Sequence, residues 1–397
     1  MTNRVSNLKP GAIPRRWQLS LVFMVTLFVA FIDRLNITYA LPLMAEEYGW
    51  TELQLQSYGS RLMSLFYVAY GIANIFLTPI AARWGTRNCL LVIVLLWSVF
   101  TAAGAFVSQF MMLFLISRIL LGLSEGIHVP MMMTATKAWF PPGERSRANS
   151  IVALGIFSAA LAAPFLLVPL MSEFGWRSGF HFLALLGLVV SLPLVFLFVR
   201  NTPQLDARIS KEERAYIADH LEDETSVQPG GLSWSDAVKL PGFALLLLSG
   251  ATNNLIGLGL TSWIPTYFHQ NRGIPFSEIT WLVAGPTAFS LLGVVTWAFV
   301  GDRLNLRALM TGIAAIIAGV ALFFALRAED LTGVILLMSL AVFFLASFQA
   351  SEFALLQHIV PQDRFASLAG LYNGASIVIG GGLGPYLLAP IIGQGEG

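Results

Sequence analysis

The chain alternates between long apolar stretches and short polar breaks. Eleven stretches are long enough to cross a bilayer, whose hydrocarbon core takes about 20 residues of helix. They cover residues 18–44, 57–81, 88–108, 111–139, 148–172, 178–199, 242–269, 279–300, 308–327, 332–359 and 367–392. This pattern predicts an all-α polytopic membrane protein.

One polar segment is much longer than the other breaks, and it separates six apolar stretches from the remaining five. It begins "RNTPQLDARISKEERAYIADHLEDET", a composition typical of a solvent-exposed connection. We therefore predict an N-terminal six-helix bundle over residues 1–200, a cytosolic linker over 201–240, and a C-terminal helical bundle over 241–397. Within the linker, Lys211 to Leu221 is expected to form a short amphipathic helix.

The placement of Lys and Arg predicts the orientation, because short cytoplasmic loops carry an excess of both. With the N-terminus inside, 17 of the 23 basic residues fall on the cytoplasmic side and three fall outside. The three outside are Arg177, Arg272 and Arg327. The start of the chain resembles a signal peptide only superficially, because its apolar run is about twice the usual length. We expect a multi-pass protein of the bacterial inner membrane with a cytoplasmic N-terminus.

Composition excludes several function classes. The chain is 56% hydrophobic and 11% charged, against about 25% charged residues in a soluble domain. Its single cysteine, Cys89, supports neither a disulfide framework nor a cysteine-built metal site. A net charge of +1 gives no reason to expect nucleic acid. The sequence contains no P-loop, nucleophile elbow or HExxH pattern, so we expect no cofactor, no metal and no enzymatic activity.

Four ionisable residues lie inside the predicted spans of the first half, where each costs a few kcal/mol to insert. Asp33 and Arg34 are adjacent in "FVAFIDRLNITYA", and Arg118 and Glu125 are seven residues apart in "SRILLGLSEGIHVP". Two helical turns place the second pair on one face. One interpretation is a structural ion pair between helices. The other is a pathway for substrate and protons, in which an anion competes for arginine while a neighbouring carboxylate takes a proton.

Other polar residues within spans allow two interpretations each. Tyr70 can hydrogen-bond a ligand or pack with a satisfied hydroxyl. Glu352 can be a second protonation site or a neutral, hydrogen-bonded acid. Further candidates near these positions are Asn74, Gln349, Asn253 and Asn254. The histidines within or near spans, such as His128, are expected to be hydrogen-bonded helix residues rather than ligands.

Several motifs resemble the major facilitator superfamily, and in particular its anion:cation symporter branch of sugar-acid and sialin-type carriers. The matching pieces include "FIDRLNI", "RILLGLSEGIHVP", "WFPPGERSRANSI" and "HIVPQDRFASLAGLYNGASIVIGG". The resemblance covers essentially the whole chain. It implies two bundles that rock about a central site. A six-plus-six plan would need one more helix than the eleven seen, which predicts either a truncated sequence or a shortened protein.

The resemblance also implies roles for individual residues. Asp33 and Glu125 match the proton-coupling acids, and Arg118 matches an arginine that modulates them. Arg34 and Tyr70 match the grip on the substrate carboxylate, with Asn373 as a further contact. The gating loops correspond to Arg83, Gly85 and Arg87 in "TPIAARWGTR" and to Asp302 and Arg303 in "AFVGDRLNLR".

Two departures from the family pattern stand out. Thr78 and Ala82 replace the usual Gly and Asp of the first gating loop, which alters a latch between the halves. Glu352 stands where sugar-acid members tend to place an uncharged polar residue or Trp.

The expected function is import of a small organic anion with protons by alternating access, with a hexonate or hexuronate as cargo. Alternatives are carboxylate exchange, uptake of an aromatic acid, or a transporter-like receptor that senses an anion. We expect a monomer whose partners are the anion, protons and the lipid bilayer, with no nucleic acid.

Overall fold

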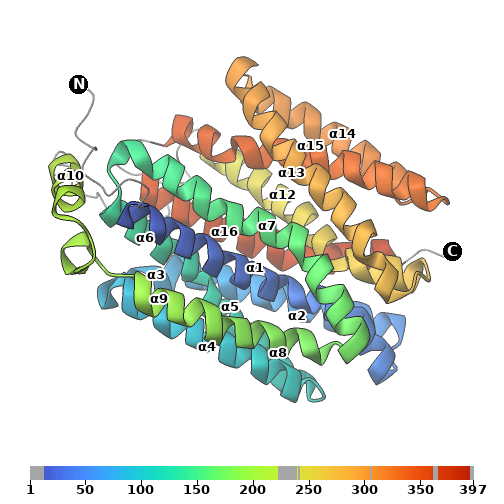
Figure 1. Cartoon of the computed structure of the whole chain (residues 1–397). Helices are drawn as coiled ribbons and strands as arrows, with labels where there is room; N and C mark the ends of the chain where they lie inside the picture. The colour runs from blue at the N-terminus through green and yellow to red at the C-terminus, as the bar shows by residue number, and fades with distance from the viewer. Residues whose placement is uncertain (1–12, 222–238, 240–241, 305, 361–364, 394–397) are drawn as a thin grey trace.

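The computed structural model describes residues 13–221, 239, 242–304, 306–360 and 365–393, and over these it is built from helices (Figure 1). The first half contains α1 (Arg15–Tyr48), α2 (Glu52–Ile72), α3 (Thr78–Ala81), α4 (Thr86–Val107), α5 (Met111–Gly126), α6 (His128–Trp139), α7 (Pro142–Phe174), α8 (Arg177–Leu186) and α9 (Leu192–Phe198). The helix α10 (Lys211–Leu221) follows. The second half contains α12 (Phe243–Thr266), α13 (Ile279–Leu304), α14 (Arg307–Ala325), α15 (Leu331–Ile359) and α16 (Phe365–Gly393).

These helices confirm the predicted fold class, and each of the eleven predicted stretches is helical. The short helix predicted within the linker, Lys211 to Leu221, is also present. Ten of the helical spans among the described residues are long and apolar enough to cross a membrane. The last stretch is the 29-residue helix α16. The chain is therefore a multi-pass membrane protein.

Prolines explain where three spans depart from one continuous α-helix. Pro79 and Pro193 each lie two residues after a π-helical turn, η1 (Ala73–Leu77) and η3 (Gly187–Ser191) respectively. Pro130 lies just after the break between α5 and α6. A proline has no N–H for the carbonyl four residues earlier, so each of these helices loses a hydrogen bond in the turn where its geometry changes.

Close contacts at glycines hold helix pairs together. A methyl group added to Gly122 or Gly126 of α5 would lie 2.4 Å or 2.3 Å from the carbonyl oxygens of Phe66 and Tyr70 of α2. The absence of a side chain at these two positions lets α5 lie against the backbone of α2. Across the two halves, Gly374 of α16 lies close to the side chain of Ile75 in the π-helical turn η1, and Gly381 lies close to that of Tyr67 in α2.

The two halves meet at one end in a shared apolar core. We call the end that carries α10 the linker end, at the left of Figure 1, and the other the opposite end. At the opposite end Leu41 and Met44 of α1 belong to the same buried cluster as Trp263 and Phe268 of the second half. Towards the linker end, Phe243 belongs to a cluster formed within the second half.

The described part of the predicted linker packs on the first half. Ile209 and Ile217 are buried in one cluster with Leu19 of α1 and Val195 of α9. Residues 222–238 and 240–241 of the predicted linker lie outside the described residues. The chain from Arg200 to Leu221 is thus joined to the first bundle by apolar burial.

Candidate functional site

The four ionisable residues predicted within the first half converge at mid-depth between α1 and α5. Asp33 is the nineteenth residue of the 34-residue helix α1, about 27 Å along an axis of about 51 Å. Arg34 contacts Glu125 with 3.3 Å between Nη2 and Oε2. Arg118 is close enough to both Asp33 and Glu125 to interact with their charges. The structure therefore places these side chains in one cluster inside the bundle.

Arg34 is a charged residue of the cluster whose side chain is partly exposed. Its Nε and Nη2 both donate to the same oxygen, Oε2 of Glu125, at 3.4 Å and 3.3 Å. Its guanidinium lies 4.4 Å from the ring centre of Tyr70, 5.2 Å from Phe31 and 5.7 Å from Phe66. The Arg34 side chain is 13% exposed and that of Glu125 is 1% exposed. Arginine held on aromatic faces is well placed to bind a carboxylate.

The two carboxylates each keep a buried oxygen without a hydrogen-bond partner among the described residues. Asp33 accepts a hydrogen bond from Thr101 of α4 at Oδ2, and its Oδ1 is unpaired. Glu125 contacts Arg34 at Oε2, and its Oε1 is unpaired. A buried unpaired carboxylate oxygen is costly unless it binds a donor, a proton or water.

Arg118 is held differently from Arg34. Its Nε is 3.5 Å from the carbonyl oxygen of Leu62, and its guanidinium lies 4.7 Å from the centre of the Phe66 ring. With Arg118 and Arg34 positive and both carboxylates negative, the cluster has no net charge. Adding one anion would therefore leave one uncompensated negative charge in a buried site.

The packing of α5 on α2 explains why these groups meet. Gly122 and Gly126 bring α5 against α2, so that Arg118 and Glu125 lie beside the Phe66 and Tyr70 turns. The spacing of seven residues within one α-helix keeps Arg118 and Glu125 on one side, as predicted from the sequence.

The predicted polar residues of the second half form two smaller contacts. The side-chain amide of Asn254 donates to the hydroxyl of Ser376 at 3.1 Å. That hydroxyl donates to the backbone carbonyl of Asn373. Tyr372 donates to Glu352, with 3.4 Å between the oxygens. No hydrogen bond among the described residues joins either group to Arg34.

Two further predicted site residues, Asn74 and Gln349, lie apart from these contacts. Asn74 is buried in the π-helical turn η1, and Gln349 is exposed on α15. Neither contacts the four-residue cluster through a hydrogen bond in the described part of the chain.

The predicted gating residues of the first loop contact their own half. Gly85 adopts φ +80°, and a Cβ there would lie 2.5 Å from the side-chain amide of Asn201. The backbone N–H of Arg87 donates to Asn201 Oδ1 at 2.9 Å, and its side chain donates to the Phe196 carbonyl. Arg83 is exposed.

The second gating loop lies at the end of α13. Arg303 is exposed there, and the side chain of Asp302 lies outside what the structure describes. The gating role of both loops stays a prediction.

Sequence reasoning missed Thr101 and Phe66. Thr101 is a hydroxyl within the apolar stretch "WSVFTAAGAF", and an isolated hydroxyl in a membrane helix is a weak signal. Phe66 contacts both arginines of the cluster, but a phenylalanine in a membrane helix gives no signal at all.

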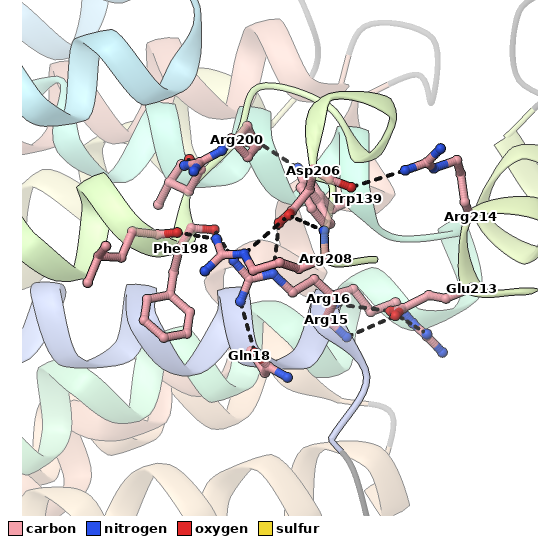
Figure 2. A network of polar contacts seen from close by, with 12 residues as sticks. Arg15, Arg16, Gln18, Trp139, Phe198, Arg200, Asp206, Arg208, Glu213 and Arg214 are labelled. Carbon is pink, nitrogen blue, oxygen red and sulfur yellow. Dashed lines mark hydrogen bonds and ion pairs between the residues drawn. The ribbon is translucent and has the colours of Figure 1, made fainter. Parts of the chain in front are cut away.

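A second polar network joins the start of α1 to the linker (Figure 2). The carboxylate of Glu213 in α10 accepts hydrogen bonds from the backbone N–H groups of Arg15 and Arg16, at 2.9 Å and 3.1 Å. These are the first two N–H groups of the helix, which otherwise have no partner within it. Arg15 also pairs with Asp206, and Arg16 with Glu144, each at 2.8 Å.

The pKa values of Asp206 and Tyr216 in this network are shifted. Burial alone raises the pKa of Asp206, but hydrogen bonds from the Arg15 side chain and the Arg208 backbone outweigh it and hold the pKa below its ordinary value. Burial and the neighbouring Glu144 carboxylate raise the pKa of Tyr216. The network therefore favours a charged Asp206 at neutral pH.

The described residues contain no group of three or more His, Cys, Asp or Glu side chains that could hold a metal ion. The two carboxylates and two guanidinium groups of the cluster can exchange protons and bind charged ligands.

The sequence model described as Major Facilitator Superfamily matches residues 23–385. Among curated proteins, a probable sulfoacetate transporter from Cupriavidus necator is 26% identical over 380 residues, covering 92% of this chain and 84% of that protein. A hexuronate transporter from Bacillus subtilis is also 26% identical, covering 92% of this chain and 85% of its own length. A probable chloroplastic anion transporter from Oryza sativa is 27% identical, and the match spans 62% of it.

Solved structures show the same fold. A bacterial homologue of the human lysosomal transporter Spinster, in an inward-facing and unoccupied conformation, superposes with a TM-score of 0.77 at 20% identity, over 96% of this chain and 83% of that one. A D-xylose-proton symporter superposes with a TM-score of 0.67 at 15% identity, over 94% of this chain and 87% of the other.

Proposed function

This chain belongs to the Major Facilitator Superfamily, and we propose that it moves a small organic anion across the membrane together with protons by alternating access. Membership of the family indicates a transporter rather than an enzyme. Relatives named as carriers of sulfoacetate, hexuronate and other anions support an organic anion as cargo. The observation that carries the proposal is the Arg34–Glu125 pair, in which a buried carboxylate contacts a partly exposed guanidinium at 3.3 Å.

Proton coupling follows from competition for Arg34. Glu125 occupies the guanidinium when it is charged, and an incoming carboxylate needs the same donors. Protonation of Glu125 weakens its hold on Arg34, and it also offsets the charge of the anion. Anion and proton then load together, and the cluster keeps its net charge.

Asp33 is the second proton carrier in this scheme. It lies in the same cluster as Glu125, so the two carboxylates affect each other's charge. Thr101 holds one oxygen and leaves the other free to take a proton. The positive charge of Arg118 interacts with both carboxylates and would modulate their protonation.

The cargo we propose is a sugar acid such as a hexonate or hexuronate. Arg34 and Tyr70 would bind its carboxylate, and the half-buried amides Asn254 and Asn373 in the other half would hydrogen-bond its hydroxyl groups. Glu352, which accepts a hydrogen bond from Tyr372, would be an additional acceptor for a hydroxyl. Carboxylate exchange and aromatic-acid uptake use the same cluster, and an anion receptor would bind without release on the other side.

We place the N-terminus and the linker end in the cytoplasm of a bacterium, following the predicted charge bias, with the chain acting as a monomer. The two rocking units would be residues 1–200 and 241–397, and residues 201–240 would connect them. Because Arg200 to Leu221 packs on the first half, that part of the connection would move with it.

Uptake of labelled D-glucuronate into proteoliposomes under an imposed pH gradient tests the proposal. We expect accumulation above equilibrium when the outside is acidic, and loss of accumulation but not of counterflow in Asp33→Asn. Counterflow without any effect of the gradient would favour the exchanger. Binding without either flux would favour the receptor.

A further inference from the structure

We propose that His269 is a third proton-binding group, which takes up a proton when the opposite end of the transporter closes. This inference rests on the proposed alternating access, but not on the nature of the cargo. His269 lies in the π-helical turn η6 (Tyr267–Asn271) at the end of α12, and it contacts α1 of the other half. The residue that it contacts there is Glu46, which lies 223 residues away in the sequence.

Both nitrogens of the His269 ring face groups that can only accept hydrogen bonds. Nδ1 is 2.7 Å from the carbonyl oxygen of Ile274, and Nε2 is 2.8 Å from Oε1 of Glu46. A neutral imidazole carries one N–H and one lone pair, so it would direct its lone pair at one of these oxygens. Only the imidazolium form satisfies both contacts. The closed arrangement therefore includes the proton on His269.

Among the charged and titratable groups around His269, the others are already paired and Glu46 is the one that contacts its ring. The neighbouring Glu47 is already bound by Trp176 Nε1 at 2.7 Å and by Arg177 at 2.8 Å. Arg272, at the end of the same turn, donates to Tyr267 and to the carbonyls of residues 328 and 329. Glu46 has no comparable arginine partner among the described residues, and it points its oxygen at the ring.

Protons reach this contact from solution. Glu46, Glu47 and His269 line an open cavity of about 590 Å³ at the opposite end, together with Trp176 and Phe276. The Glu46 side chain is 57% exposed and that of His269 is 14% exposed. The contact between Glu46 and His269 is therefore open to solution at the opposite end.

The contact adds pH dependence to a closure that other groups also hold. Gln270 donates to the carbonyl of Pro42 in α1 at 3.1 Å, a bond that does not titrate. The shared apolar core, including Met44 and Phe268, lies at the same end. When the halves separate there, His269 loses its contact with Glu46.

The sign of the effect follows from proton linkage. Both acceptors face the His269 ring only when this end is closed, so the protonated ring favours closure and raising the pH disfavours it. One proton changes the ratio of closed to open forms by at most about tenfold per pH unit. Acid on the outside therefore stabilises the form that is closed to the outside.

Distance measurements between spin labels on the full chain in lipid nanodiscs test this inference. Cysteines at the exposed positions Glu173 and Glu329, one in each half at the opposite end, carry the labels in a Cys89→Ser background. Without any anion, we expect the closed fraction to fall between pH 5 and 9 by up to about tenfold per unit. His269→Gln should weaken this dependence, and Asp33 and Glu125 account for what remains. His181→Gln is the matched control, an exposed histidine of the first half that should leave it intact.

A second variant separates the loss of a proton site from a loss of folding. Glu46→Gln can hydrogen-bond a neutral His269, so we expect a folded protein whose closure depends less on pH than that of the wild type. An unchanged pH slope in both variants, or a flat wild-type profile, would overturn the inference. A flat profile in a protein that accumulates anion would leave the proposed function intact, whereas a pH-sensitive closure without any anion flux would overturn that function and keep the role of His269.

Discussion

Replacing Glu125 by Gln fixes the cluster in the form that we assign to the proton-loaded site. The amide keeps the size of the side chain and an oxygen for Arg34, but it removes the negative charge. Two unit charges at the 3.3 Å of this pair attract each other by about 5 kcal/mol at an effective dielectric constant of about 20. A neutral hydrogen bond retains about 1 kcal/mol.

Only part of this difference is available to an anion, since Arg34 is partly exposed and retains its aromatic contacts. We therefore expect a gain of about 1–3 kcal/mol in anion binding, or roughly 5- to 150-fold tighter affinity. In the wild-type protein, affinity should strengthen as the pH falls. In Glu125→Gln, affinity should be already high and much less dependent on pH.

Equilibrium binding of labelled D-glucuronate between pH 5 and 8 measures both quantities, and proteoliposome uptake follows coupling in the same samples. The variant should perform counterflow but should not accumulate the anion under a pH gradient. Glu144→Gln is a matched control, because Glu144 forms an Arg–Glu pair at the linker end and should not affect coupling. Weaker binding with the wild-type pH dependence in Glu125→Gln would refute the competition for Arg34.

Three further substitutions test the supporting structure. Thr101→Val removes the hydroxyl that holds Asp33, so gradient-driven uptake should fall about fivefold while anion binding stays within about twofold. Gly126→Ala places a methyl group 2.3 Å from a backbone oxygen of α2, so it should destabilise the protein by about 1–3 kcal/mol in thermal unfolding. Gly319→Ala is the control, because its methyl group meets nothing within 4 Å and should not change the stability. Asp206→Asn should cost about 1–3 kcal/mol at neutral pH. Because the folded pKa of Asp206 is depressed, the wild-type advantage is present above the ordinary aspartate value, and it should disappear in unfolding scans as the pH falls through the folded value. Equal stability of the two proteins at neutral pH would contradict this.

The helices followed from the sequence because bilayer thickness fixes the length of an apolar span. Their ends did not. The α1 helix begins at Arg15 rather than at the predicted residue 18, because Glu213 from a distant segment accepts its first N–H groups. It also continues to Tyr48, past the apolar window, and Gly49 ends it with a left-handed φ of 63°. Hydropathy detects burial in lipid, whereas a helix end depends on capping partners that are remote in sequence.

Because charge is costly inside a membrane, the sequence predicted which residues form the site. It did not predict which arginine pairs with which acid. Spacing placed Arg118 and Glu125 on one face, and composition singled out Asp33 and Arg34. Sequence periodicity contains no information on which arginine meets which acid across two helices. The structure selects Arg34 with Glu125, a choice that depends on the close approach of α5 to α2.

The most direct test of proton coupling is proton movement driven by the anion alone. Proteoliposomes with a trapped pH indicator and no initial pH gradient would receive external D-glucuronate while anion entry is followed by label. The account predicts that the interior acidifies as the anion enters, and that Glu125→Gln shows no such acidification. Entry of the anion at the wild-type rate with an unchanged internal pH would contradict it.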